Sequence, residues 1–260
     1  MFIIALFLKK TTFITFFDKK MWKLWLILKL WYNYIVKGAL NMKRIINNAF
    51  ALILNFLIIV GAVYATGGMI TKYYSLNGTL SYYVFRYLNV TTAIFLALTS
   101  CVMVIMEFRN LLDTNATTFS WCLSLRLLGV TASVMTLIFA LCIIVPKEGF
   151  SRTFSGYRLT LNLICPLLGI YNFLFFENTN YIDFKTTWFS IIFNSLYSLV
   201  YLIMVVWVKK WPDYYSLFRG SNLIPIGVFV IMTALTLGVC VGLYFLYCFL
   251  NRKIKEFPLS

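Results

Sequence analysis

Histidine is absent from this 260-residue chain, and acidic residues are scarce, with 8 Asp and Glu against 23 Lys and Arg. The lack of histidine removes the commonest general base and the commonest metal ligand of proteins. We therefore expect no zinc or other metal site, no cofactor and no histidine-based catalysis. Charged residues make up only 12% of the chain, which is about half of the share usual in a soluble domain.

The cysteines and the positive charge do not indicate a secreted or a nucleic-acid-binding protein. All six cysteines lie inside apolar runs and none forms a CxxC pair, which argues against a disulfide framework. The net charge of +15 comes mostly from the first 44 residues and from the connecting segments. Membrane proteins distribute their charge in this way, so we expect no nucleic-acid partner.

Long apolar runs are what the sequence has in abundance. Hydrophobic residues make up 62% of the chain and the mean hydropathy is +0.85. Because about 20 apolar residues span a bilayer as a helix, the chain predicts an all-α, polytopic membrane protein with a six-helix transmembrane bundle over residues 45–250. The predicted spans are 45–65, 82–106, 121–145, 159–176, 187–208 and 224–250. Residues 251–260 form a basic cytoplasmic tail, and Gly67-Gly68 is expected to mark a turn.

Residues 1–44 form a basic, aromatic-rich N-terminal segment with nine Lys and Arg against the single acid Asp18. Within residues 21–37, Lys23, Lys29 and Lys37 share one helical arc, and apolar side chains cover most of the rest. This pattern predicts an amphipathic helix that lies in the membrane interface over anionic lipid headgroups. An alternative is that translation begins at Met42, directly before the first span.

The distribution of basic residues predicts the orientation. With the N-terminus inside, the inner side carries 14 Lys and Arg and the outer side carries 7. Because cytoplasmic segments are enriched in basic residues, we expect both chain ends to be cytoplasmic. Without the first 44 residues the counts become 5 and 7, which favour the opposite orientation.

Four predicted spans carry polar or small residues at helical spacing. Such residues in a membrane tend to face the bundle interior, where they either join helices by hydrogen bonds or line a small polar cavity. The four stripes are Asn89, Thr92, Ala93, Leu96, Ser100 and Met103; Arg126, Gly129, Ser133 and Thr136; Asn162, Cys165, Pro166, Gly169 and Asn172; and Ser190, Asn194, Tyr197, Ser198 and Tyr201.

The candidate pocket residues come from these stripes and from arginines near span ends: Asn89, Thr92, Asn162, Asn194, Arg86 and Arg126. The arginines either extend to lipid headgroups or bind a carboxylate or lipid phosphate. Glu107 and Glu177 close two spans and are expected to lie in water.

Three segments carry a family resemblance: FRYLNVTTAIFLAL (85–98), SGYRLTLNLICPLLGIYNFLFFE (155–177) and KKWPDYYSLF (209–218). They resemble a six-span membrane family of low-GC bacteria. That family is similar to the androgen-induced-gene proteins of animals, intramembrane threonine hydrolases of fatty-acid esters of hydroxy fatty acids. The resemblance implies a six-span fold, a lipid-sized polar pocket and a bacterial plasma membrane.

The resemblance also implies where catalytic residues would stand. In the family a threonine in the second span is the proposed nucleophile, and a histidine four residues before a proline in the fourth span is the proposed base. These positions read Asn89 and Asn162 here, the latter followed by Pro166. An amide does not take up a proton near neutral pH, so the substitution argues against this chemistry.

We therefore hypothesise a non-catalytic membrane protein that holds a lipid or fatty-acyl ligand near Asn89, Thr92 and Asn162. One alternative is an intramembrane lipid-ester hydrolase that uses Thr91 or Thr92, whose hydroxyl would need an activating base. Another is a small transporter, for which acids embedded in the membrane are expected.

Overall fold

The structure is a computed structural model that describes residues 19–77, 82–113, 116–177, 182–213, 215 and 225–256. Within these ranges every regular element is helical and no strand occurs. Among the described residues, six helical stretches are long and apolar enough to cross a membrane, which confirms the all-α polytopic fold. They are Met42–Tyr74, Leu88–Leu112, Ser120–Glu148, Tyr157–Phe175, Thr187–Trp207 and Pro225–Asn251.

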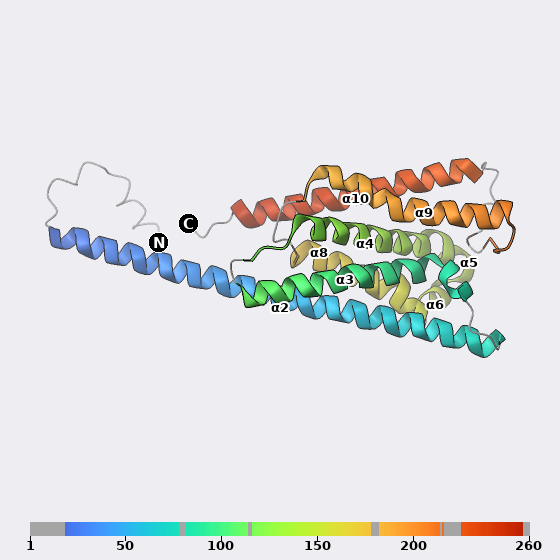
Figure 1. The fold of residues 1–260 in the computed structure, drawn as a ribbon, viewed down its shortest axis with the longest axis horizontal. Helices are drawn as coiled ribbons and strands as arrows, with labels where there is room; N and C mark the ends of the chain where they lie inside the picture. The colour runs from blue at the N-terminus through green and yellow to red at the C-terminus, as the bar shows by residue number, and fades with distance from the viewer. Residues whose placement is uncertain are drawn as a thin grey trace. The chain divides into compact units, whose positions relative to one another are not determined.

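The helical elements follow one another along the chain as labelled in Figure 1. The α-helices are α2 (Lys19–Asn77), α3 (Leu88–Leu112), α4 (Ser120–Phe139), α5 (Val145–Glu148), α6 (Phe150–Thr153), α7 (Tyr157–Leu159), α8 (Cys165–Phe175), α9 (Ser190–Leu202) and α10 (Pro225–Glu256). Two 3-10 helices, η2 (Tyr82–Arg86) and η5 (Phe184–Phe189), precede α3 and α9. Three π-helical turns are η3 (Ala140–Ile144), η4 (Thr160–Ile164) and η6 (Ile203–Trp207).

The chain divides into two units, residues 1–46 and residues 47–260. In the first unit residues 19–46 are helical, and they include the predicted interfacial helix at 21–37. Residues 1–18 and the side chains of residues 19–41 lie outside the described part of the molecule, so the interfacial position stays a prediction. Residues 257–260 of the predicted basic tail also lie outside the described part of the molecule.

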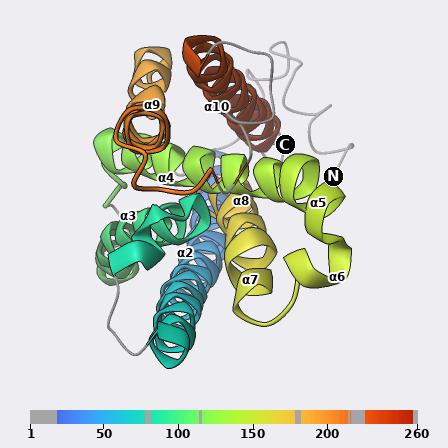
Figure 2. The ribbon, with the colours of Figure 1, turned by 90° about the vertical axis from the view of Figure 1, so that its right-hand side faces the viewer.

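Helix α4 is the centre of the second unit. It contacts α3, α8, α9 and α10, and Figure 2 shows α9 and α10 on one side of it and α3 and α8 on the other. The apolar core of this unit joins Ile58 of α2 to Leu96 of α3, Leu127 of α4 and Cys165 of α8. The bundle therefore packs around a helix that carries one of the predicted polar stripes.

The predicted stripes in α3, in α4 and in η4 with α8 face the bundle interior. The stripe of α4 is fully buried, and Thr92 and Ser100 of α3 and Asn172 of α8 are buried with it. Gly129 shows why small residues stand here, because a Cβ at this position would lie 2.5 Å from Thr99 Oγ1. Close approach between α3 and α4 thus depends on a glycine, as in other membrane helix pairs.

The turn expected at Gly67-Gly68 is wrong, because α2 runs through both glycines and ends only at Asn77. A Cβ on Gly68 would lie 2.1 Å from the ring of Tyr157, whereas a Cβ on Gly67 would meet nothing within 4 Å. Gly68 therefore allows the close approach of α7 to α2. Inside a membrane an unbroken helix also keeps every backbone hydrogen bond satisfied.

The two ends of the second unit differ in backbone geometry. We call the end where α3 and α8 begin the cleft end, and the end where α3 and α8 finish the ion-pair end. The three π-helical turns of the described residues all lie at the cleft end, because η3 follows α4, η4 precedes α8 and η6 follows α9. In η4 the N–H of Cys165 donates to the carbonyl of Thr160, five residues earlier, directly before Pro166, which has no N–H to donate.

Candidate functional site

Two asparagine side chains meet at the cleft end. Asn89 lies in the first turn of α3, and its Nδ2 donates a hydrogen bond of 3.0 Å to Oδ1 of Asn162 in η4. Nδ2 of Asn162 donates to the carbonyl of Thr153, at 3.1 Å. Asn162 is buried and Asn89 is half-buried. The pair thus connects two helices and is anchored to the segment that enters α7.

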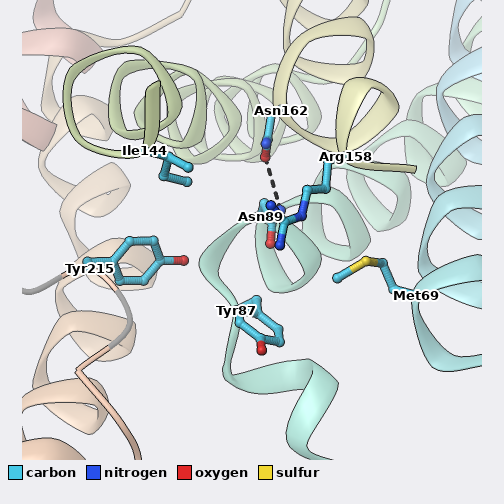
Figure 3. A pocket seen from close by; sticks show the side chains of 7 residues that line it. All are labelled: Met69, Tyr87, Asn89, Ile144, Arg158, Asn162 and Tyr215. Carbon is cyan, nitrogen blue, oxygen red and sulfur yellow. Dashed lines mark hydrogen bonds between the residues drawn. The ribbon is translucent and has the colours of Figure 1, made fainter. Parts of the chain in front are cut away.

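A small cleft opens beside the pair, and Figure 3 shows its seven lining residues. Arg158 and Tyr215 point toward Asn89 from opposite sides in this view. The space measures about 10 Å³, which is about what one water molecule needs. Oδ1 of Asn89 is buried and has no hydrogen-bond partner among the described residues. The lining residues are Met69, Tyr87, Asn89, Ile144, Arg158, Asn162 and Tyr215.

The walls of the cleft are fixed by further polar contacts. The phenol oxygen of Tyr215 accepts the backbone N–H of Leu88, at 3.0 Å. Because the first amides of a helix have no partner within that helix, this contact caps α3 from outside. Lys147 Nζ donates to the carbonyl of Tyr215, and the Arg158 guanidinium forms an ion pair with Glu148.

Two of the three π-helical turns contribute directly to the cleft. Ile144 is the last residue of η3, and Asn162 lies in the middle of η4. A π-helical turn inserts one residue into a helix and changes the direction of the side chains that follow, and such turns are frequent at functional sites. The irregular backbone is therefore an observation, independent of the side chains, that marks this end of the bundle.

The other predicted pocket residues do not line the cleft. Thr92 Oγ1 lies 2.6 Å from Thr136 Oγ1 and donates to the carbonyl of Leu88, so it joins α3 to α4. The backbone carbonyl of Arg86 accepts the hydroxyl of Tyr197. Asn194 is buried on α9, and its side-chain amide has no hydrogen-bond partner in the described part of the chain.

Arg126 lies toward the ion-pair end, level with the middle of α3, and its side chain is not exposed at the surface. Its side chain is fully buried, and its Nε forms an ion pair of 2.9 Å with Oε2 of Glu177. Its Nη1 donates to Ser100 Oγ at 2.7 Å. Oε1 of Glu177 accepts from Nδ2 of Asn55 at 2.8 Å and from Nδ2 of Asn172 at 2.9 Å.

The expectation that Glu107 and Glu177 lie in water is wrong, because neither residue is exposed. Glu177 follows the end of α8 by two residues, and its carboxylate is held by groups from α2, α4 and α8. Sequence reasoning missed this because both acids stand at the ends of apolar runs. The signal available was Arg126 itself, since a buried arginine requires a carboxylate or other acceptors.

Comparison with family models, with curated proteins and with solved structures finds no match to this chain. The family resemblance of the sequence thus stays a prediction. The structure does bring together the two positions that this resemblance assigns to nucleophile and base. They meet as the Asn89–Asn162 amide pair.

Proposed function

We propose that this multi-pass membrane protein binds the polar head of a membrane amphiphile, a lipid or fatty-acyl molecule, in the cleft beside Asn89 and Asn162. The observation that carries the proposal is the unpartnered Oδ1 of Asn89, which faces a cleft at the irregular end of the bundle. A buried acceptor without a donor is costly. A hydroxyl, a protonated acid or a headgroup water supplies that donor.

The size of the cleft supports a head-only mode of binding. Its space of about 10 Å³ accommodates one water-sized group, whereas an acyl chain needs far more. The chain of the ligand then lies along the apolar outer surface of the bundle, where large hydrophobic side chains are exposed. We propose that the protein acts in a bacterial plasma membrane, with both chain ends on the cytoplasmic side.

The threonine hydroxyls do not favour hydrolysis. Thr91 Oγ1 donates to the carbonyl of Leu88 at 3.0 Å, and Thr92 Oγ1 is shared between Leu88 and Thr136. A hydroxyl nucleophile needs a base within hydrogen-bond reach, and the contacts of both hydroxyls lead to carbonyls and to another hydroxyl. We therefore propose a non-catalytic role.

Photolabelling tests the proposal. The purified protein is placed in phosphatidylcholine nanodiscs with a fatty acid that carries a photoreactive diazirine next to its carboxyl group. We expect labelling of peptides that contain Met69 or Ile144. Asn89→Leu should weaken it up to about tenfold, the effect of losing one hydrogen bond.

Asn194→Leu is the matched control, because it replaces another asparagine of the bundle that lies outside the cleft. We expect Asn194→Leu to leave labelling at Met69 and Ile144 intact. Equal labelling of the wild type and Asn89→Leu would contradict head binding at the cleft.

The buried ion pair favours transport as a second candidate function. Ionisable groups within membrane helices frequently mark proton or substrate paths, and Arg126 and Glu177 are fully buried. If the protein transports protons, liposomes that contain it should dissipate a pH gradient faster than empty liposomes, and Glu177→Gln should abolish the difference. Equal rates for protein-containing and empty liposomes would exclude proton transport.

A further inference from the structure

The cleft end of the second unit is strongly basic. Seven basic and two acidic residues lie there among the described residues, whereas the described part of the ion-pair end has six basic and five acidic ones. Lys72, Lys147, Arg152, Lys209 and Lys210 are exposed. The seven basic residues are Lys72, Arg86, Lys147, Arg152, Arg158, Lys209 and Lys210, and the two acidic ones are Glu148 and Asp213.

Charges gathered around an opening raise the local concentration of ligands of opposite sign. The excess of positive charge lies at the same end of the bundle as the cleft beside Asn89, and Arg158 is itself part of the cleft lining. A guanidinium group pairs with carboxylates and phosphates through two parallel hydrogen bonds. Both the excess of basic residues and the guanidinium group of Arg158 therefore favour an anionic ligand.

Arg158 already has an anionic partner within the chain. Its Nη1 pairs with Oε2 of Glu148, and this pair is partly exposed, with 34% of the Arg158 side chain and 29% of the Glu148 side chain accessible. A partly exposed pair is weak, because water competes for both charges. An incoming carboxylate or phosphate can therefore replace Glu148 without leaving a buried charge unpaired.

From these observations we propose that the cleft takes an anionic head group, a carboxylate or a phosphate, and that Glu148 competes with this head for Arg158. The proposal rests on the head-binding function above and names the class of its ligand. In the complex the anionic oxygens accept hydrogen bonds from the partly exposed Arg158 at the edge of the cleft, and a hydroxyl or a water bound to the head occupies the water-sized space and donates to Oδ1 of Asn89. A neutral head lacks the first of these contacts.

A competition experiment tests the anionic class. Dodecanoate, dodecyl phosphate and methyl dodecanoate, which share one chain length and differ in the charge of the head, compete with the photoreactive fatty acid in phosphatidylcholine nanodiscs. We expect the two anions to compete about tenfold better than the methyl ester, as loss of a charge-assisted hydrogen bond predicts. If dodecanoate competes better than dodecyl phosphate, the head group is that of a fatty acid. The opposite order indicates a lipid phosphate.

Two variants with opposite expected effects separate binding from folding. Arg158→Gln should remove the preference for anions, whereas Glu148→Gln should strengthen it, and a misfolded variant does not gain affinity. If the methyl ester competes as well as dodecanoate while Asn89→Leu still weakens labelling, the anionic class is overturned and the head-binding function stands. If no probe labels the cleft in an Asn89-dependent way, the head-binding function itself fails.

Discussion

At the ion-pair end the side chains of Arg126 and Glu177 are fully buried and linked to α2, α3 and α8, whereas at the cleft end Asn89 and Asn162 share one hydrogen bond beside an open space. Asn89 and Ser100 mark the two levels on α3, and the rise of a helix places them about 16 Å apart. One bundle thus holds a buried ion pair that is closed off and an amide pair that borders an open cleft with Arg158 in its lining.

The difference indicates a division of roles between stability and binding. A buried ion pair is costly to break by removing one partner, about 3–5 kcal/mol, whereas hydrogen bonds between membrane helices average about 0.6 kcal/mol. The ion pair therefore fixes the positions of its helices relative to one another. The contacts at the cleft end can be exchanged for those of a ligand at a small cost in free energy. We therefore expect ligand binding at the end whose contacts cost less free energy to break.

The largest effect is expected from breaking the ion pair. Glu177→Ala leaves Arg126 buried without its carboxylate and should lower the free energy of unfolding by about 3–5 kcal/mol. Steric trapping in bicelles measures this quantity. Glu148→Ala, which removes the acid of the exposed pair at the cleft end, should cost about 0–1 kcal/mol.

A double variant refines the test of the ion pair. Arg126→Leu together with Glu177→Leu leaves no unpaired charge, so it should be less destabilised than Glu177→Ala. A cost below 1 kcal/mol for Glu177→Ala would show that the ion-pair end is no more rigid than the cleft end, and the contrast between the two would fall.

An intermediate effect is expected at Gly68, where the cleft end has one tight contact. Gly68→Ala places a Cβ 2.1 Å from the Tyr157 ring, and overpacking of this kind costs about 1–3 kcal/mol. Gly67→Ala is the matched control on the same helix, because nothing lies within 4 Å of its Cβ. Steric trapping should place Gly67→Ala at or above the wild type, since alanine favours helix over glycine by up to about 1 kcal/mol. Equal stability of the two variants would mean that α7 moves away freely.

The sequence predicts the helices and their buried faces but not the partners of the buried groups. Helical periodicity placed Asn89 and Asn162 on interior faces, and they meet in the structure. Arg126 was also placed on an interior stripe, yet its partner Glu177 lies 51 residues away, and helical spacing carries no information about contacts at that separation. A charged residue next to an apolar run predicts an exposed side chain, and this prediction is wrong for Glu177.

The cleft itself was only half predictable. Arg158, Met69 and Tyr215 come from separate elements and line it because three chain segments converge there. The π-helical turns η3 and η4 rotate Ile144 and Asn162 relative to a regular helix, and an ideal 3.6-residue period does not reveal such an inserted residue. The interior position of each asparagine was thus visible in the sequence, and the residues around the pair were not.

A small effect on stability is expected at Asn162, together with a several-fold effect on the proposed binding. Asn162→Leu removes the hydrogen bonds to Asn89 and to the carbonyl of Thr153, and the membrane average puts the cost near 0.6 kcal/mol for each. The free energy of unfolding in bicelles should therefore fall by about 1 kcal/mol, while photolabelling of the cleft should fall several-fold because Asn89 loses the group that orients it. If Asn162→Leu lowers stability as much as Glu177→Ala, the amide pair is itself a structural contact of the bundle. The cleft end would then have no contacts that a ligand could replace cheaply.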